Sequence, residues 1–281
     1  MTNFLAQIVV WLNAVANTLG GAILTPIETL PGWLSATLVA CVTGVLLLLI
    51  FKYTSNQQAI KQVRADIKAN MLALKLFKES ASVALEAQGR ILVGAFWLLI
   101  YALVPILVMM VPVLLILGQL GLWYQARPLH QGEEALVKLK LGGEGDAPLP
   151  DVRLLSTDAV TVETGPVRVP SKHEVWWNIK AQMKGYHRLS FQVGDQDYEK
   201  ELAVGDGFMR VSMQRPGRQW SDLLMHPSEK PFDPESAVQS IEIIYPSRAS
   251  WTSGTDSWVI YWFVTSMVAA LIVRRPLNVN V

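Results

Sequence analysis

Cysteine and charge are the two things that this sequence has least of. It holds a single cysteine, Cys41, in 281 residues, which excludes an intramolecular disulfide and a zinc site built from several thiolates. Only 17% of its residues are charged, against roughly 25% in an ordinary soluble domain. Lysine and arginine number 24 and aspartate and glutamate 23, so the charge balance predicts no nucleic-acid partner.

Signatures of catalysis and of cofactor binding are also missing from the sequence. The glycine-rich run 142–146 is not followed by the lysine and hydroxyl pair of a phosphate-binding loop, so we predict a turn there. No serine or cysteine lies in a nucleophile motif. We therefore expect no enzyme, no catalytic residue, no metal and no cofactor. The four histidines lack metal-ligand spacing: His130, His173, His187 and His226.

Three long runs without charge account for the charge deficit. They extend from Trp33 to Phe51, from Ile91 to Gln125 and from Ser257 to Val273. Apolar runs of about 18 residues or more are typical of bilayer spans, so we predict spans over 31–52, 91–125 and 252–274. The second run is longer than a bilayer needs and contains two prolines, which predicts a tilted or kinked helix.

Basic residues set the orientation that we predict. Residues 1–51 contain none, whereas residues 52–90 contain seven against three acidic residues, a net charge of +4. The positive-inside rule places residues 53–90 and the tail 275–281 in the cytoplasm, with the N-terminus and residues 126–251 outside. An outer domain without cysteine, and a start without a signal-peptide pattern, favour a multi-pass protein of a bacterial inner (cytoplasmic) membrane.

The N-terminal segment 1–30 has an apolar stripe at helical spacing. Ile8, Trp11, Val15 and Leu19 lie on it, and the asparagines lie mostly off it. This pattern favours an amphipathic helix in the outer membrane interface. A poor additional span is the alternative.

A heptad seam marks the cytoplasmic segment 53–90. Its apolar positions alternate at spacings of three and four, and the basic residues lie off them, so we predict a basic helical hairpin with coiled-coil packing. The alternative is a helix that rests on the anionic inner leaflet. The seam residues are Ile60, Val63, Ile67, Leu74 and Phe77.

The outer segment 126–251 alternates apolar and polar residues, with turn residues every eight to twelve positions. We predict strands over 135–141, 160–163, 167–169, 174–181, 185–193, 198–204 and 241–245. About seven short strands, with tryptophans on a central one, resemble an all-β immunoglobulin-like sandwich without the usual cysteine pair. The expected fold is therefore a three-span α-helical membrane core with a coiled-coil segment, and a β-sandwich inserted between spans two and three.

Small polar residues and flanking cations are the candidate functional groups of the spans. The spans contain no Asp, Glu, Lys, Arg or His, which argues against proton relays and ion coupling. The small polar residues suit close helix packing. They also suit a weakly polar groove with a basic rim at its cytoplasmic mouth. The groove and rim residues are Thr43, Thr265, Ser266, Lys52, Arg90, Arg274 and Arg275.

This arrangement resembles the three-span core of the Oxa/YidC insertase superfamily, in particular the branch of the endoplasmic-reticulum membrane complex. The run SNQQAIKQVRADIKAN at 55–70 is similar to the coiled-coil entry of bacterial members, and the segments 74–78, 88–92 and 103–105 continue the similarity. The resemblance covers roughly residues 33–125 and 252–275. Many bacterial members carry a basic residue within the first core span, and it has no counterpart between Trp33 and Phe51.

The resemblance implies a membrane-protein insertase or insertion chaperone that works without hydrolysing ATP. Its groove lowers the cost of moving polar flanks across hydrocarbon, and Arg90 is the candidate for the missing charge. The implied partners are the lipid bilayer, hydrophobic nascent or membrane-protein substrates, and the ribosome or translocon. A membrane-anchored adaptor, whose outer domain binds an envelope partner, is the second hypothesis, and a scaffold that assembles through the heptad seam is the third.

Thiol labelling tests the orientation. In a Cys41→Ser background we expect a membrane-impermeant maleimide to label Asp195→Cys in intact spheroplasts and to spare Asn70→Cys, because the two positions lie on opposite sides of the bilayer. Lysed spheroplasts, in which both positions react, are the control. Labelling of position 70 from outside contradicts the topology.

Overall fold

The computed structural model describes residues 2–26, 30–77, 80–143, 149–217, 219–248 and 257–279. The chain divides into two compact units, which are described separately. One unit comprises Met1–Ala36 and Leu114–Tyr261 and is called the β unit. The other comprises Thr37–Val113 and Trp262–Val281 and is called the helical unit. Three helices, α2, α4 and α6, contribute residues to both.

Two helices are long and apolar enough to cross a membrane. They are α2, Gly32–Thr54, and α4, Ala81–Tyr124. A third apolar helix, α6, is shorter and spans Trp258–Val273. The predicted start of the third span, residues 252–256, lies outside the described residues. The other helices are α1, Thr2–Leu24, α3, Gln57–Leu76, and the short α5, Trp220–Met225.

Helices α2 and α6 cross at Gly44 within the helical unit. A Cβ atom at this glycine would lie 2.2 Å from the backbone oxygen of Ser266, so only glycine permits this approach. One residue away, Trp262 Nε1 donates a 2.9 Å hydrogen bond to Thr43 Oγ1. Small residues at such a crossing are the usual device for close helix packing in lipid.

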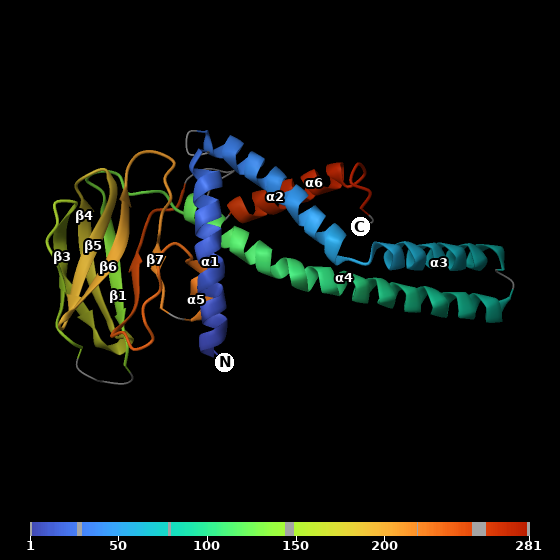
Figure 1. Ribbon diagram of the computed structural model, residues 1–281, viewed down its shortest axis with the longest axis horizontal. Coiled ribbons are helices and arrows are strands. Elements are labelled where there is room, and N and C mark those ends of the chain that lie inside the picture. The colour runs from blue at the N-terminus through green and yellow to red at the C-terminus, as the bar shows by residue number, and fades with distance from the viewer. Residues whose placement is uncertain are drawn as a thin grey trace. The chain divides into compact units, whose positions relative to one another are not determined.

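Helices α3 and α4 lie side by side as a hairpin in the helical unit (Figure 1). The side chain of Asn56 caps α3 by accepting a 3.1 Å hydrogen bond from the Ala59 backbone N–H. Ile67 and Val63 of α3 lie against Gly94 of α4, where a Cβ would come within 2.8 Å of Ile67. The heptad seam of α3 therefore contacts this chain's own next helix.

The strands form two antiparallel sheets in the β unit (Figure 1). One sheet has the order β3-β4-β1-β8-β7 and the other β2-β5-β6. The bounds are β1 Glu134–Leu141, β2 Val152–Leu154, β3 Val160–Val169, β4 Glu174–Ala181, β5 Gly185–Val193, β6 Gln196–Val204, β7 Gln214–Arg215 and β8 Val238–Ile243.

Period-two alternation builds the core of the β unit from both sheets. In β4, Val175, Trp177 and Ile179 are buried while their neighbours are partly exposed. Trp177 meets Phe191 of β5 across the core, with ring centroids 5.4 Å apart. One hydrophobic cluster contains buried residues of β1, β4, β5, β6 and β8, so the two sheets enclose a common core.

Strand β3 forms one edge of the larger sheet and is exposed along most of its length. Its pairing with β4 shifts register on either side of Thr164. Gly165 has φ +132, a conformation that L side chains rarely adopt, and Pro166 has no N–H to donate. These features are typical of a protected sheet edge.

The structure confirms the mixed class, with apolar helices long enough to span a membrane and a region of antiparallel sheets. The predicted strands are present, because each lies within or overlaps an observed one. The two segments predicted at 160–163 and 167–169 are parts of the single strand β3. A three-span core and an immunoglobulin-like topology stay predictions.

The α2–α6 crossing yields a stability prediction. We expect Gly44→Ala to lower the stability of the detergent-solubilised chain by about 1–3 kcal/mol, because its methyl group forces two helix backbones apart. The matched control is Gly89→Ala, which has open space around it in α4 and should be neutral or stabilising by up to about 1 kcal/mol. Equal melting temperatures for the two variants would contradict the close crossing.

Candidate functional site

Basic residues follow the α2–α6 crossing on both helices. Lys52 and Arg274 each lie eight residues beyond the Gly44–Ser266 crossing, which is about 12 Å along each helix. The predicted basic rim of Lys52, Arg274 and Arg275 therefore stays a prediction.

The structure places Arg90 elsewhere. It lies in α4, four residues before the Gly94 contact with Ile67, and so about 20 Å along the hairpin from the start of α3. Its guanidinium forms an exposed ion pair with Glu86, with Nη2 2.6 Å from Oε1. The hairpin arm therefore holds this cation.

The small polar residues of the spans lie mainly in helix contacts. Thr43 accepts the Trp262 hydrogen bond and donates one of 3.0 Å to the Ala40 carbonyl. Ser266 is buried and donates to the Phe263 carbonyl at 2.9 Å, and Thr265 beside it is half-buried. The sequence left two interpretations open for these residues, close helix packing or a polar groove. The contacts of Thr43 and Ser266 are those of packing between α2 and α6.

An apolar hollow of about 400 Å³ lies along α2. Apolar side chains and the lone cysteine line it: Cys41, Val42, Val45, Leu46 and Leu49. Val42 is 63% exposed and Leu46 44%. This surface offers hydrocarbon contact to whatever lies against it, and it carries no polar lining.

The seam residues of α3 differ in burial. Ile60 is buried at the start of the helix, while Val63, Ile67 and Leu74 are half-buried. Phe77 follows the last turn and is 54% exposed. Contact with α4 therefore covers the first part of the seam more completely than its end.

A collar of aromatic residues joins the helix ends within the β unit. Tyr124 donates a 3.0 Å hydrogen bond from its hydroxyl to Ser35 Oγ of α2, and its ring stacks on Trp258 of α6 at 6.4 Å. Phe208 packs 5.3 Å from Tyr124. Arg248 lies over Phe208 at 4.6 Å and donates to the Ala126 carbonyl. These contacts tie the ends of α2, α4 and α6 to the sandwich.

Charged groups fix the short link from α4 to β1. Arg127 and Glu133 form a two-fold hydrogen-bonded ion pair at 2.7 and 2.8 Å, and the His130 backbone N–H donates to Glu133 at 2.8 Å. These donors lower the pKa of Glu133 to about 2. Its contribution to stability is therefore present above the ordinary carboxyl pKa and is lost as pH falls toward 2. Burial, in contrast, lowers the pKa of Arg248 to about 10.

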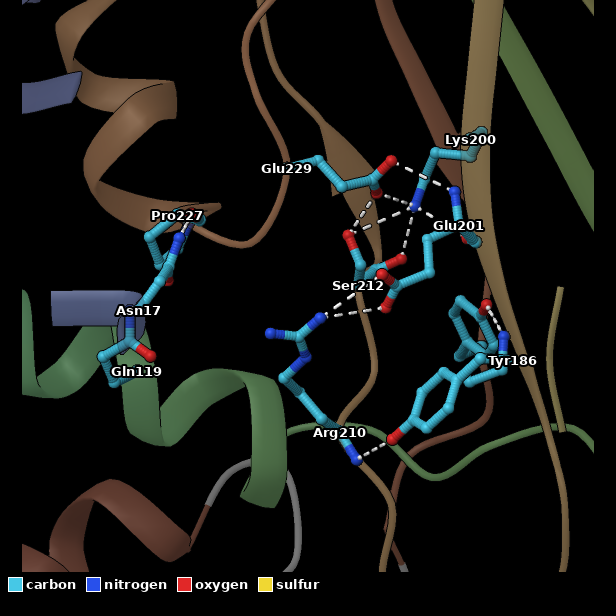
Figure 2. Close-up of polar contacts among 11 residues, drawn as sticks. Asn17, Gln119, Tyr186, Lys200, Glu201, Arg210, Ser212, Pro227 and Glu229 are labelled. Carbon is cyan, nitrogen blue, oxygen red and sulfur yellow. Dashed lines mark hydrogen bonds and ion pairs between the residues drawn. The ribbon is translucent and has the colours of Figure 1, made fainter. Parts of the chain in front are cut away.

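A buried lysine centres the polar cluster of the β unit (Figure 2). Lys200 is fully buried, and its Nζ lies 2.5 Å from Glu229 Oε1 and 2.6 Å from the Ser212 carbonyl oxygen. The Glu201 carbonyl and Ser212 Oγ complete its surroundings at 3.0 and 3.2 Å. Burial lowers the pKa of Lys200, and the Glu229 carboxylate opposes that shift.

Glu229 connects this cluster to the segment that carries α5. Its second oxygen accepts a 3.0 Å hydrogen bond from the Glu201 backbone N–H, which fixes it to β6. Two residues earlier, the Pro227 carbonyl accepts a 2.7 Å hydrogen bond from Asn17 of α1, and Gln119 of α4 donates to Asn17 Oδ1 at 2.6 Å (Figure 2). Polar contacts thus run from the sandwich core to the end of α4.

This cluster was not predicted from the sequence, although one residue pattern pointed to it. Lys200 occupies an inward position of β6, in phase with Tyr198 and Leu202. A lysine on the buried phase of a strand requires a partner, because an unpaired buried charge is costly. The partner Glu229 lies in an irregular segment 29 residues later, where no periodicity points to it.

No protein-family model, no curated protein and no solved structure matches this chain.

The buried pair yields a second stability prediction. We expect Lys200→Met to destabilise the chain by about 3–5 kcal/mol, because Glu229 then stays buried without its counter-charge. Lys138→Met is the matched control: it breaks the more exposed Lys138–Glu242 pair, where a loss of no more than about 1 kcal/mol is expected. Calorimetry of the full chain measures both, and equal effects would show that Lys200 does not hold the α5 segment.

Proposed function

We propose that this chain is a membrane-protein insertase or insertion chaperone of the Oxa/YidC type, held in the bilayer by α2, part of α4 and α6. The observation that carries the proposal is the exposure of their apolar side chains. Only 33% of the most apolar stretch of α2 is buried, and only 6% of that of α4. Core helices of soluble proteins are mostly buried, so these surfaces suit a lipid environment.

The hairpin contact supports a position for the second span. Ile67 lies against Gly94, and ten residues back α3 begins at Gln57, so the start of α3 is level with about residue 104 of α4. Stacked Trp97 and Tyr101 mark this region, and Trp123 and Tyr124 mark the other end. Residues 101–123 measure about 33 Å, close to the thickness of a bilayer core. In this proposal, residues 81–100 belong to the cytoplasmic hairpin.

The arrangement of the apolar helices supports lateral access for a client. Close contacts join α2 to α6, whereas only 6% of the most apolar stretch of α4 is buried, which supports helices that stay open toward lipid along that stretch. In this proposal, a hydrophobic segment contacts the hollow on α2. Its polar flanks pass Lys52, Arg274 and Arg275, and the shortness of α6 thins the bilayer locally.

The proposal places the chain in a bacterial inner membrane, with its N-terminus outside and its C-terminus in the cytoplasm. The sandwich, which we propose is immunoglobulin-like, then lies on the outer side. Its two antiparallel sheets with Trp177 on a central strand support that assignment. The ribosome or the translocon is the proposed partner of the basic hairpin.

A second candidate function is a membrane-anchored adaptor, favoured by a hollow on the sandwich. It measures about 420 Å³ and lies between the edge strands β2 and β3. Trp177 and Val152 form its apolar floor, and Asp151 and Arg153 lie at its rim. An envelope protein that binds here would leave the helices a purely anchoring role.

Site-specific photocrosslinking tests the proposed function. With p-benzoylphenylalanine at Leu46, in the hollow on α2, we expect nascent membrane proteins to be captured several-fold more than with the same group at Met267 of α6. The two side chains are 44% and 47% exposed and lie within three residues of the Gly44–Ser266 crossing, so depth and exposure are matched.

The crosslinking has two contrary outcomes. Equal capture at both positions means that Leu46 contacts only lipid and passing proteins, which contradicts an insertase. Capture of a folded envelope protein from a probe at Arg153, with no client at Leu46, favours the adaptor.

A further inference from the structure

The polar side chains of α1 are used within the β unit. Asn13 donates a 2.6 Å hydrogen bond to the Leu223 carbonyl of α5 and is buried. One turn later, Asn17 donates to the Pro227 carbonyl and accepts from Gln119. The asparagines that divide an otherwise apolar helix thus hold it against α5 and α4.

Large apolar side chains of α1 are exposed. Trp11 is 66% exposed, Leu19 57%, Val15 41% and Ile8 39%. The sequence has no charged residue before Glu28. A helix exposing this much apolar surface without a single charge requires a non-aqueous neighbour.

Helix α5 extends this apolar surface. Trp220 and Met225 are 59% and 65% exposed, and α5 packs beside α1 (Figure 1). Its close fit to α4 depends on Gly118, where a Cβ atom would lie 2.6 Å from the Leu224 carbonyl oxygen. Two helices far apart in the sequence, each with an exposed tryptophan, therefore pack beside one another.

The contacts with α4 give the depth of this surface. Gln119, which binds Asn17, lies five residues before the interfacial Tyr124, and Gly118 lies six before it. At 1.5 Å per residue these positions are about 7–9 Å inward along α4. Helices that lie in a membrane interface are buried by about 5–10 Å.

We propose that the exposed faces of α1 and α5 form one ledge that lies in the outer leaflet, with lipid as its partner. The ledge rests on the proposed position of the second span but not on insertase activity. Lipid is the occupant because α1 and α5 contact α4 at Gln119 and Gly118, within the apolar length of that helix and at the depth that these two positions set. Since α1 has no charge, its binding should not depend on anionic lipid or salt.

Depth-dependent quenching in vesicles tests the ledge. The full chain with Cys41→Ser receives an environment-sensitive NBD label at Trp11→Cys or Trp220→Cys and is reconstituted in phosphatidylcholine. We expect both labels to resist iodide, and to be quenched more by a nitroxide near the lipid headgroup than by one deep in the acyl chain. Adding phosphatidylserine or 0.5 M salt should change neither result.

Two further positions calibrate the measurement. A label at Asp195→Cys, in the β5–β6 turn, should be quenched by iodide, and one at Val108→Cys, in the apolar half of α4, by the deep nitroxide. Iodide quenching of both positions 11 and 220 would overturn the ledge. Deep quenching of position 11 would also overturn it, because α1 would then be a fourth span. Neither result depends on client capture at Leu46.

Discussion

The rest of this structure depends on apolar side chains that are exposed along its long helices. Along α2, α4 and α6, leucines, valines and phenylalanines point away from the chain, and the backbone behind them is satisfied only because it is helical. A bilayer accepts such surfaces, since helices leave no backbone group for water to bind. Given that surrounding, close contacts are needed only where helices meet, and there the chain places glycine, serine and threonine.

In the β unit, polar contacts orient the elements relative to one another. They connect elements that hydrophobic packing alone would leave loosely oriented. Lys200 fixes Glu229, and the segment carrying Glu229 offers backbone carbonyls to the asparagines of α1. The aromatic collar adds a second attachment through Tyr124 and Ser35. Each attachment joins the two sheets to the ends of apolar helices, so several separate contacts hold the β unit together.

Much of the fold was predictable from the sequence, because alternation and charge-free runs follow directly from backbone geometry. The strands and the apolar helices are examples. The side chains that connect them were less predictable. The spacing of Asn13 and Asn17 predicted a water-exposed polar face on an interfacial helix. Both side chains instead donate hydrogen bonds to carbonyls more than 200 residues away. Thr43 and Ser266 fitted a groove and a packing contact equally well, since spacing alone does not show which helix lies opposite. Arg90 was predicted to lie with the other cations because it directly precedes an apolar run. Helix α4 begins nine residues earlier, so Arg90 lies within the helix and not at its end.

The protected edge of β3 affects how copies of this chain can associate when many of them are crowded together. Proteins confined to a membrane meet neighbours of the same kind edge-on, in two dimensions and at high local concentration. An unprotected edge strand of ten residues could pair with the same strand of a neighbouring copy through backbone hydrogen bonds. The register shifts around Thr164, the positive φ of Gly165 and the missing N–H donor at Pro166 deny a neighbour the regular row of backbone groups that such pairing needs. Crowding can therefore bring these domains together without fusing their sheets.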